Sequence, residues 1–161
     1  MTYWEKTMHR AKGFSLIELM IVLSVVAILV SIAAPSFRTA MLNSRLSSTT
    51  STLYSALQMA RSEAVTQRTT IRVCAANDAN SACANSTNWS NGALIMRGAT
   101  LLRVIPLANT DVTVESSGNN VDYNGDGTTT ATTITVSDSR NQPRQIKINV
   151  IGQACSGSAC S

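Results

Sequence analysis

Residues 12–18, Lys-Gly-Phe-Ser-Leu-Ile-Glu, lead directly into a long apolar run, and this junction decides the fold. The run covers residues 16–34, LIELMIVLSVVAILVSIAA, and its single charged side chain is Glu18. At a rise of about 1.5 Å per residue, a helix of this length just crosses a hydrocarbon core of about 30 Å. Basic residues precede the run, which predicts a cytoplasmic N-terminus and a remainder that lies outside the cytoplasm.

Three interpretations of this segment compete. A cleaved signal peptide would use the small residues near 31–33, but its apolar core is usually about 7–15 residues long, shorter than this run. A plain signal anchor would stay uncut. In the third interpretation, residues 12–18 resemble the type IV prepilin processing motif: a basic leader, Gly, Phe, two residues, an aliphatic residue and Glu. This resemblance, which we favour, implies cleavage after Gly13 by prepilin peptidase and N-methylation of Phe14.

Glu18 is the residue that a simple anchor does not explain. A carboxylate inside a transmembrane helix costs up to a few kcal/mol and normally has a partner. Cleavage after Gly13 would create one, the new amino group of Phe14, in the same chain or in a neighbouring subunit of a helical filament. A glutamate that reaches water at the membrane edge is the plainer alternative. Because residues 12–18 match the motif throughout, we favour the pairing.

The apolar run is followed by Pro35 and then by an amphipathic pattern. Proline removes one backbone hydrogen bond, which predicts a kink at Pro35. Apolar or small residues then recur at steps of three or four and predict a helix over 36–68 that continues the anchor and lies against a sheet. These positions are Leu42, Leu46, Thr49, Leu53, Leu57, Ala60 and Ala64. The Ser/Thr run at 47–52 forms helices poorly, which predicts fraying or a bend there.

From residue 69 onward the sequence is typical of β-strands. β-Branched residues alternate or cluster between Gly, Asn and Asp breaks at 70–75, 93–96, 101–105, 112–115, 121–123, 134–137 and 145–151. One long helix followed by antiparallel strands is an α+β layout. We therefore divide the chain into a cleaved leader (1–13), a transmembrane and filament-core helix (14–35) and a head (36–161), whose part 69–161 is β-rich.

Residues 57–65, Leu-Gln-Met-Ala-Arg-Ser-Glu-Ala-Val, resemble the helix-end motif of the GspH/FimT family of minor type IV pilins and type II secretion pseudopilins. The resemblance extends over nearly the whole chain and is closest over 12–72. It implies a type IV pilin-like fold, in which a long helix, half transmembrane and half amphipathic, packs on an antiparallel β-sheet head. The sequence does not separate a pilus subunit from a secretion pseudopilin.

The same resemblance implies a function and a location. The function is structural: a minor subunit that primes or caps assembly of a filament. Its partners are other major and minor pilins, the inner-membrane assembly platform and prepilin peptidase. The protein is expected in the bacterial inner membrane, with a cytoplasmic N-terminus and a periplasmic head, and then in the filament.

Four cysteines, Cys74, Cys83, Cys155 and Cys160, allow three pairings. Outside the cytoplasm oxidised pairs are expected. Local closure favours Cys74–Cys83, around an Asn/Ser-rich loop, and Cys155–Cys160, in the C-terminal tail, although sequence alone does not choose. A four-thiolate zinc site is the alternative, and the sequence has no Cys-x2-Cys spacing to support it.

The charged and catalytic side chains argue against an enzyme. The single histidine, His9, lies in the leader, so its removal would exclude catalytic triads and histidine metal sites. The acidic residues show no cluster that suggests acid/base chemistry. We therefore expect no enzyme and no cofactor. The net charge of +4 falls to about +2 without the leader, which gives no strong electrostatic case for nucleic acid.

Residues 122–127, Asp-Tyr-Asn-Gly-Asp-Gly, resemble the first half of a calcium loop, with Asp122, Asn124 and Asp126 as candidate ligands. The twelfth position of such a loop supplies a bidentate acid, and here it is Thr133. A hairpin turn explains the same residues. We therefore favour the turn over the metal site.

DNA binding is the alternative function. Some FimT-type pilins, which this chain resembles, serve natural transformation as uptake receptors at the pilus tip. These pilins bind DNA through a C-terminal Gly-Arg-x-Arg stretch. The matching residues here, 152–155, read Gly-Gln-Ala-Cys and lack both arginines. Arg140, Arg144 and Lys147 could contact phosphates, but a solvated strand edge explains them equally well. We therefore do not favour DNA binding.

Overall fold

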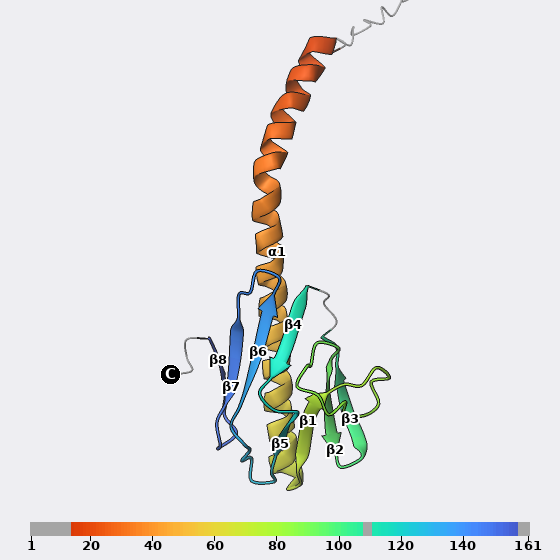
Figure 1. The fold of residues 1–161 in the computed structure, drawn as a ribbon, viewed down its shortest axis with the longest axis vertical. Coiled ribbons are helices and arrows are strands. Elements are labelled where there is room, and N and C mark those ends of the chain that lie inside the picture. Colours follow the sequence, from red (N-terminus) through yellow and green to blue (C-terminus); the bar gives the residue numbers. More distant parts are fainter. Residues whose placement is uncertain (1–13, 108–110, 158–161) are drawn as a thin grey trace, which may run out of the picture. The chain divides into compact units, whose positions relative to one another are not determined.

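The computed structural model describes residues 14–107 and 111–157. They form one helix, α1 (Leu16–Gln67), and eight strands (Figure 1). The strands are β1 (Ile71–Ala75), β2 (Ala93–Arg97), β3 (Thr100–Ile105), β4 (Val112–Ser116), β5 (Asn120–Tyr123), β6 (Thr132–Asp138), β7 (Arg144–Ile148) and β8 (Ala154–Ser156). The chain divides into two compact units, the first ending at Thr39 and the second, the head, beginning at Ala40. The predicted leader lies outside the described residues.

The first unit is the N-terminal part of α1. Ser15 caps the helix, because its Oγ accepts a hydrogen bond from the backbone N–H of Glu18 at 3.2 Å. An 18-residue window of mean hydropathy 2.8 follows and has no buried residue, so this helix is long and apolar enough to cross a membrane. α1 continues through Pro35. The kink there remains a prediction.

In the head, α1 buries the stripe that the sequence predicts. Its buried residues are Leu42, Leu46, Thr49, Thr50, Leu53, Ala56, Leu57, Ala60 and Ala64. The predicted fraying at 47–52 is wrong, since the helix is continuous there. Burial of Thr49 and Thr50 outweighs their weak propensity, and Thr50 Oγ1 donates to the carbonyl of Leu46 at 2.7 Å. The helix ends at Gln67, with Arg68 at φ +50° and a bond from Thr69 N–H to the Ala64 carbonyl.

The strands form two antiparallel four-stranded sheets, ordered β3-β2-β1-β5 and β4-β6-β7-β8, where the sequence had predicted one sheet (Figure 1). The seven predicted segments correspond to β1–β7. The last predicted strand, 145–151, is too long at its C-terminal end. β7 ends at Ile148, because residues 149–152 form a turn in which the Gly152 N–H donates to the Asn149 carbonyl. The sequence analysis missed β8, which pairs with β7.

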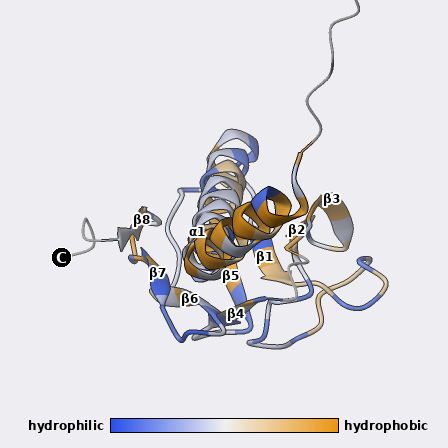
Figure 2. Ribbon diagram, turned by 90° about the horizontal axis from the view of Figure 1, so that it is seen from above, coloured by the Kyte–Doolittle hydropathy of each residue, from blue (hydrophilic) through white to orange (hydrophobic). Residues whose placement is uncertain are grey.

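The core lies between α1 and both sheets. It is built from the helix stripe and from inward-facing residues of all eight described strands, including Val73, Ile95, Val114, Val136 and Ile146. Figure 2 shows the strands arranged around one side of α1. The head therefore has a hydrophobic core of its own.

Candidate functional site

The first candidate region is the start of α1, where Phe14 is 81% exposed and Glu18 is exposed. Ser15 is the N-cap and Glu18 the third helical residue, the Ser-x-x-Glu spacing of a capping box. An acid in the first turn is also favoured by the helix dipole. Glu18 therefore has a local role at the helix start, which the sequence analysis did not recognise. Gly13 lies outside the described residues.

Large apolar side chains cover the rest of this segment and are exposed. They include Leu19, Leu23, Ile28, Leu29, Ile32 and Phe37. Burying one such side chain is worth about 1.5–3 kcal/mol, so a surface of this extent requires lipid or other protein to cover it. The helix thus provides a surface suited to anchoring and packing.

The second candidate region is the end of α1, where Arg61 donates hydrogen bonds to two turns of the head. Its Nε donates to the carbonyl of Gly127 at 3.2 Å, and its Nη2 donates to the carbonyl of Ile151 at 2.8 Å. One turn joins β5 to β6 and the other joins β7 to β8. The motif at 57–65 thus combines buried Ala60 and Ala64 with an arginine that ties both sheets to the helix.

The glycines of these turns allow close backbone approach. A methyl group at Gly125 would lie 2.6 Å from the carbonyl carbon of Arg68, and one at Gly152 would overlap the carbonyl oxygen of Gly127. Gly127 and Gly152 also have positive φ, +84° and +76°. These contacts explain the glycines of the sequence at 122–127 without a bound ion.

The acidic residues of that turn face protein donors. Asp122 accepts bonds from Arg72 at 2.7 and 2.9 Å and from Asn120. Burial works to raise the pKa of Asp122, but the hydrogen bonds from Arg72 and Asn120 lower it. Asp126 accepts from the N–H and hydroxyl of Thr128, which lowers its pKa too. A cation beside Asp122 opposes calcium there, and the described residues contain no group of three or more His, Cys, Asp or Glu placed for a metal.

Two cysteines are joined in the described part of the chain. The bond between Cys74 and Cys83 links β1 to the loop that follows it. The same loop is held by Asn77, whose Oδ1 accepts from the N–H groups of Ser81 and Ala82. Cys155 is also disulfide-bonded. Its predicted partner, Cys160, lies outside the described residues.

Two of the three candidate DNA contacts, Arg140 and Arg144, contact side chains of α1 that are four positions apart. Arg140 is bound to Asp138 at 2.8 Å and to Asn43 at 2.7 Å. Arg144 points toward α1, where its Nη1 lies 3.5 Å from Ser47 Oγ. Arg144 and Lys147 line one pocket. Arg140 is already ion-paired with Asp138, so DNA binding is still not favoured. Lys147 also lines a second, polar cavity.

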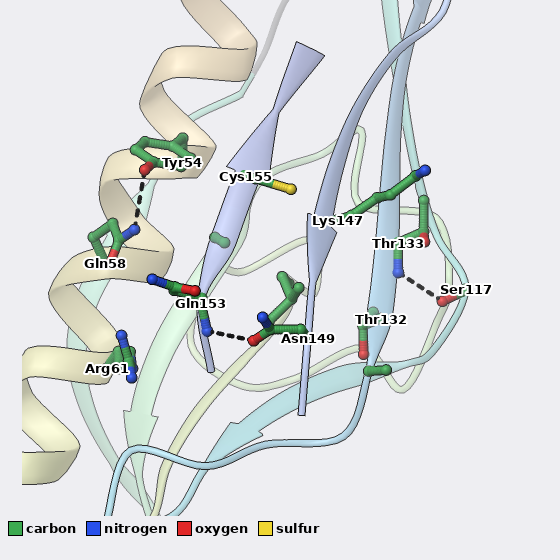
Figure 3. Close-up of a pocket in the computed structure, with 13 residues that line it drawn as sticks. Tyr54, Gln58, Arg61, Ser117, Thr132, Thr133, Lys147, Asn149, Gln153 and Cys155 are labelled. Carbon is green, nitrogen blue, oxygen red and sulfur yellow. Dashed lines mark hydrogen bonds between the residues drawn. The ribbon is translucent and has the colours of Figure 1, made fainter. Parts of the chain in front are cut away.

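That cavity is an open groove of about 910 Å³ between α1 and the strands β6, β7 and β8 (Figure 3). Amide and hydroxyl side chains dominate its lining, and Gln58 donates to the Tyr54 hydroxyl. Its lining residues include no carboxylate and no imidazole, and its cysteine is disulfide-bonded. The lining therefore lacks the carboxylates and imidazoles that most often serve as general bases.

Comparisons with known proteins agree with this architecture. Residues 49–152 match the family described as type II transport protein GspH. Residues 8–34 match the prokaryotic N-terminal methylation motif. Among curated proteins, none matches the sequence significantly.

The fold is similar to two crystal structures of the type IV minor pilin FimU of Pseudomonas aeruginosa. The first is 21% identical with a TM-score of 0.57 and covers 77% of this chain and 93% of that chain. The second is 22% identical with a TM-score of 0.55 and covers 74% and 95%. These similarities confirm the predicted α+β pilin fold, and this family and fold are structural pilins, not enzymes. The chain therefore belongs to the GspH family and is a GspH/FimT-type minor pilin or pseudopilin.

Proposed function

We propose that this chain is a structural subunit that primes or caps assembly of a type IV pilus or type II secretion filament. The observation that supports the proposal is the division of α1 into an exposed N-terminal part and a part that is buried in the head. Up to Thr39 the helix buries no side chain, whereas from Leu42 to Ala64 it buries a full stripe in the head. A helix built in this way can leave lipid and pack against the helices of other subunits while its head stays folded.

Glu18 sets the stagger between subunits in this proposal. Prepilin peptidase cuts after Gly13, and the Phe14 amine that it frees pairs with the Glu18 carboxylate of a neighbouring subunit. The exposed carboxylate in the first turn of α1 supports this pairing. Before assembly, the subunit stays in the inner membrane with its head in the periplasm, in contact with the assembly platform and with other pilins.

Mass spectrometry of the mature protein tests the processing step. The expected N-terminus is Phe14 carrying one methyl group. A mature chain that begins near Ala34 would identify an ordinary signal peptide, and one that still begins at Met1 would identify an uncut anchor. Either result contradicts the proposal.

Substitution of Glu18 tests its role in assembly and separates charge from capping. Glu18→Gln keeps a side chain that fits a capping box, whereas Glu18→Ala removes it. If the charge matters, both variants stay in the membrane pool and fail to enter sheared filaments. The matched control is Glu63→Ala in the head, which should enter normally. Normal incorporation of Glu18→Ala would refute the pairing, and loss in Glu18→Ala alone would point to capping.

Deletion of the gene tests priming or capping directly. A priming subunit is needed in few copies per filament, so its loss should lower the number of filaments more than their length. Expression of the intact chain in the deletion strain should restore the number. An unchanged filament count would contradict this part of the proposal.

A further inference from the structure

Strand β3 (Thr100–Ile105) lies at the edge of the first sheet, and in the described part of the chain β2 is its sole strand neighbour. By contrast, β4, an edge strand of the second sheet, is hydrogen-bonded on its outer side to the loop between β1 and β2. The Trp89 N–H donates to the Val114 carbonyl and the Ser116 N–H donates to the Thr87 carbonyl, both at 2.8 Å. An uncovered edge presents backbone N–H and C=O groups to which an extended chain can pair.

A groove of about 420 Å³ runs between this edge and α1. On the helix side it is lined by small hydroxyl residues, Ser48, Ser51, Thr52 and Ser55. They fall on one helix face at steps of one, three and four, and all are exposed. Short side chains on the helix leave room for a second chain to approach β3. The Ser/Thr run, although unfavourable for a helix, thus leaves space for a second chain at this surface.

Arg103 gives the groove its charge. It lies on β3, and the acceptor that its Nη1 reaches is the thioether sulfur of Met59 at 3.2 Å. A thioether is a weak acceptor, whereas a guanidinium has five N–H donors that match a carboxylate. Within the described residues, no carboxylate ion-pairs with Arg103. The cation is therefore available to a partner.

From this edge, groove and cation, we propose that β3 binds an extended acidic segment of another protein chain, which adds a strand to the first sheet and pairs a carboxylate with Arg103. Exposed Leu101 and Val104, each 38% exposed, would contact its side chains. A second copy of this chain fits less well, because antiparallel pairing of two β3 strands would bring two Arg103 side chains to neighbouring positions. That the segment comes from another filament subunit rests on the proposed function; the pairing itself does not.

Fluorescent peptides and the full chain in detergent micelles test this inference. The first peptide has eight residues that alternate threonine and valine around a central glutamate, and the second has lysine in place of glutamate. An opposite-charge pair across strands contributes up to about 1 kcal/mol, so the glutamate peptide should bind about fivefold more tightly. A third peptide, the glutamate peptide N-methylated at alternate amides, should lose binding because it cannot pair with the edge.

Variants of the protein make the test specific. Arg103→Glu should reverse the preference, so that the lysine peptide binds more tightly. Arg144→Glu, the same charge change in the second sheet, should leave the preference unchanged. Ser51→Trp, which fills the groove, should weaken both peptides. Circular dichroism should show that each variant is folded.

Three results would overturn the inference: no binding of any peptide, equal binding of the glutamate and lysine peptides, or an unchanged preference in Arg103→Glu. None of these results involves a filament, so they would leave the role of Glu18 in assembly untouched. Conversely, normal incorporation of Glu18→Ala would refute the proposed pairing of Glu18 and leave the peptide result standing.

Discussion

Gly152 stands where two turns of the head meet, and single-residue changes have their largest expected effect there. Its φ is +76°, and a methyl group on it would overlap the carbonyl oxygen of Gly127. Left-handed backbone costs an alanine about 1–2 kcal/mol, and an overlap with backbone typically costs a further 1–3 kcal/mol. We expect Gly152→Ala to lower the free energy of unfolding by about 3 kcal/mol, measured by urea denaturation with Trp89 fluorescence.

Gly98 provides the matched control for this prediction. Its φ is +56°, but a methyl group there would meet nothing within 4 Å. Gly98→Ala should therefore cost only the backbone term, about 1 kcal/mol. Equal losses in the two variants would show that the contact between the turns does not matter.

Asp122 makes the stability of the head depend on pH. Its pKa is lowered in the folded state by hydrogen bonds from Arg72 and Asn120, which outweigh the opposing effect of burial. A carboxyl whose folded pKa lies below its unfolded pKa stabilises the fold above the unfolded value, about 3.9, and loses that contribution as the pH falls through the folded pKa. We expect the wild type to lose more stability than Asp122→Asn between pH 5 and about pH 2, in urea denaturation at each pH.

Asp126 and Asp138 share the lowered pKa, so Asp122→Asn should retain part of the acid dependence. Asp78→Asn, an exposed residue of the loop after β1, is the control and should follow the wild type. If Asp122→Asn also followed the wild type, the pair with Arg72 would contribute no measurable stability.

At the scale of elements, the loop between β1 and β2 depends on the Cys74–Cys83 bond, which closes a short loop of sequence separation 9. In the chain-entropy account, a bond around such a loop stabilises by about 2–3 kcal/mol. We expect the double variant Cys74→Ala, Cys83→Ala to lose about that much, with the same urea assay. Reduced wild-type protein, which also loses the disulfide of Cys155, should lose at least as much stability. An unchanged midpoint in both would contradict the prediction.

The elements also show what the sequence could and could not provide. The stripe from Leu42 to Ala64 predicted the helix, because one buried face produces a regular spacing. The strand at 154–156 was missed because Ala, Cys and Ser are not among the β-branched and aromatic residues that mark strands. Its pairing with β7 depends on the turn at 149–152. The fraying predicted at 47–52 was wrong for a different reason: tertiary burial of Thr49 and Thr50 overrode local propensity.

The candidate sites also divide into those that the sequence could reveal and those that it could not. The junction at 12–18 could be recognised because its residues are contiguous and their chemistry is unusual in a membrane segment. The contacts of Arg61 could not, since they join residues that are 66 and 90 positions apart in the sequence. Arg103 and the groove beside β3 were likewise invisible, because an edge strand is defined only by the order of strands in its sheet.

For the whole molecule, the division at Thr39 and Ala40 predicts that the head folds without the N-terminal segment. The core cluster extends from Leu46 to Ala154, and residues 14–39 contribute no buried side chain to it. A fragment of residues 40–161 should therefore unfold cooperatively in urea, with coincident transitions in Trp89 fluorescence and far-ultraviolet circular dichroism. Its free energy of unfolding should match that of the full chain in detergent.

A shorter fragment, residues 50–161, sharpens this prediction. It lacks Leu42 and Leu46, which are 7% and 1% exposed. Burial of one leucine is worth about 1.5–3 kcal/mol, so this fragment should be less stable than residues 40–161 by at least about 3 kcal/mol. If the two fragments were equally stable, the N-terminal turns of the head helix would lie outside the core. If residues 40–161 failed to fold, the N-terminal segment would be needed for folding, and the head could not remain intact during the proposed transfer of that segment from lipid into a filament.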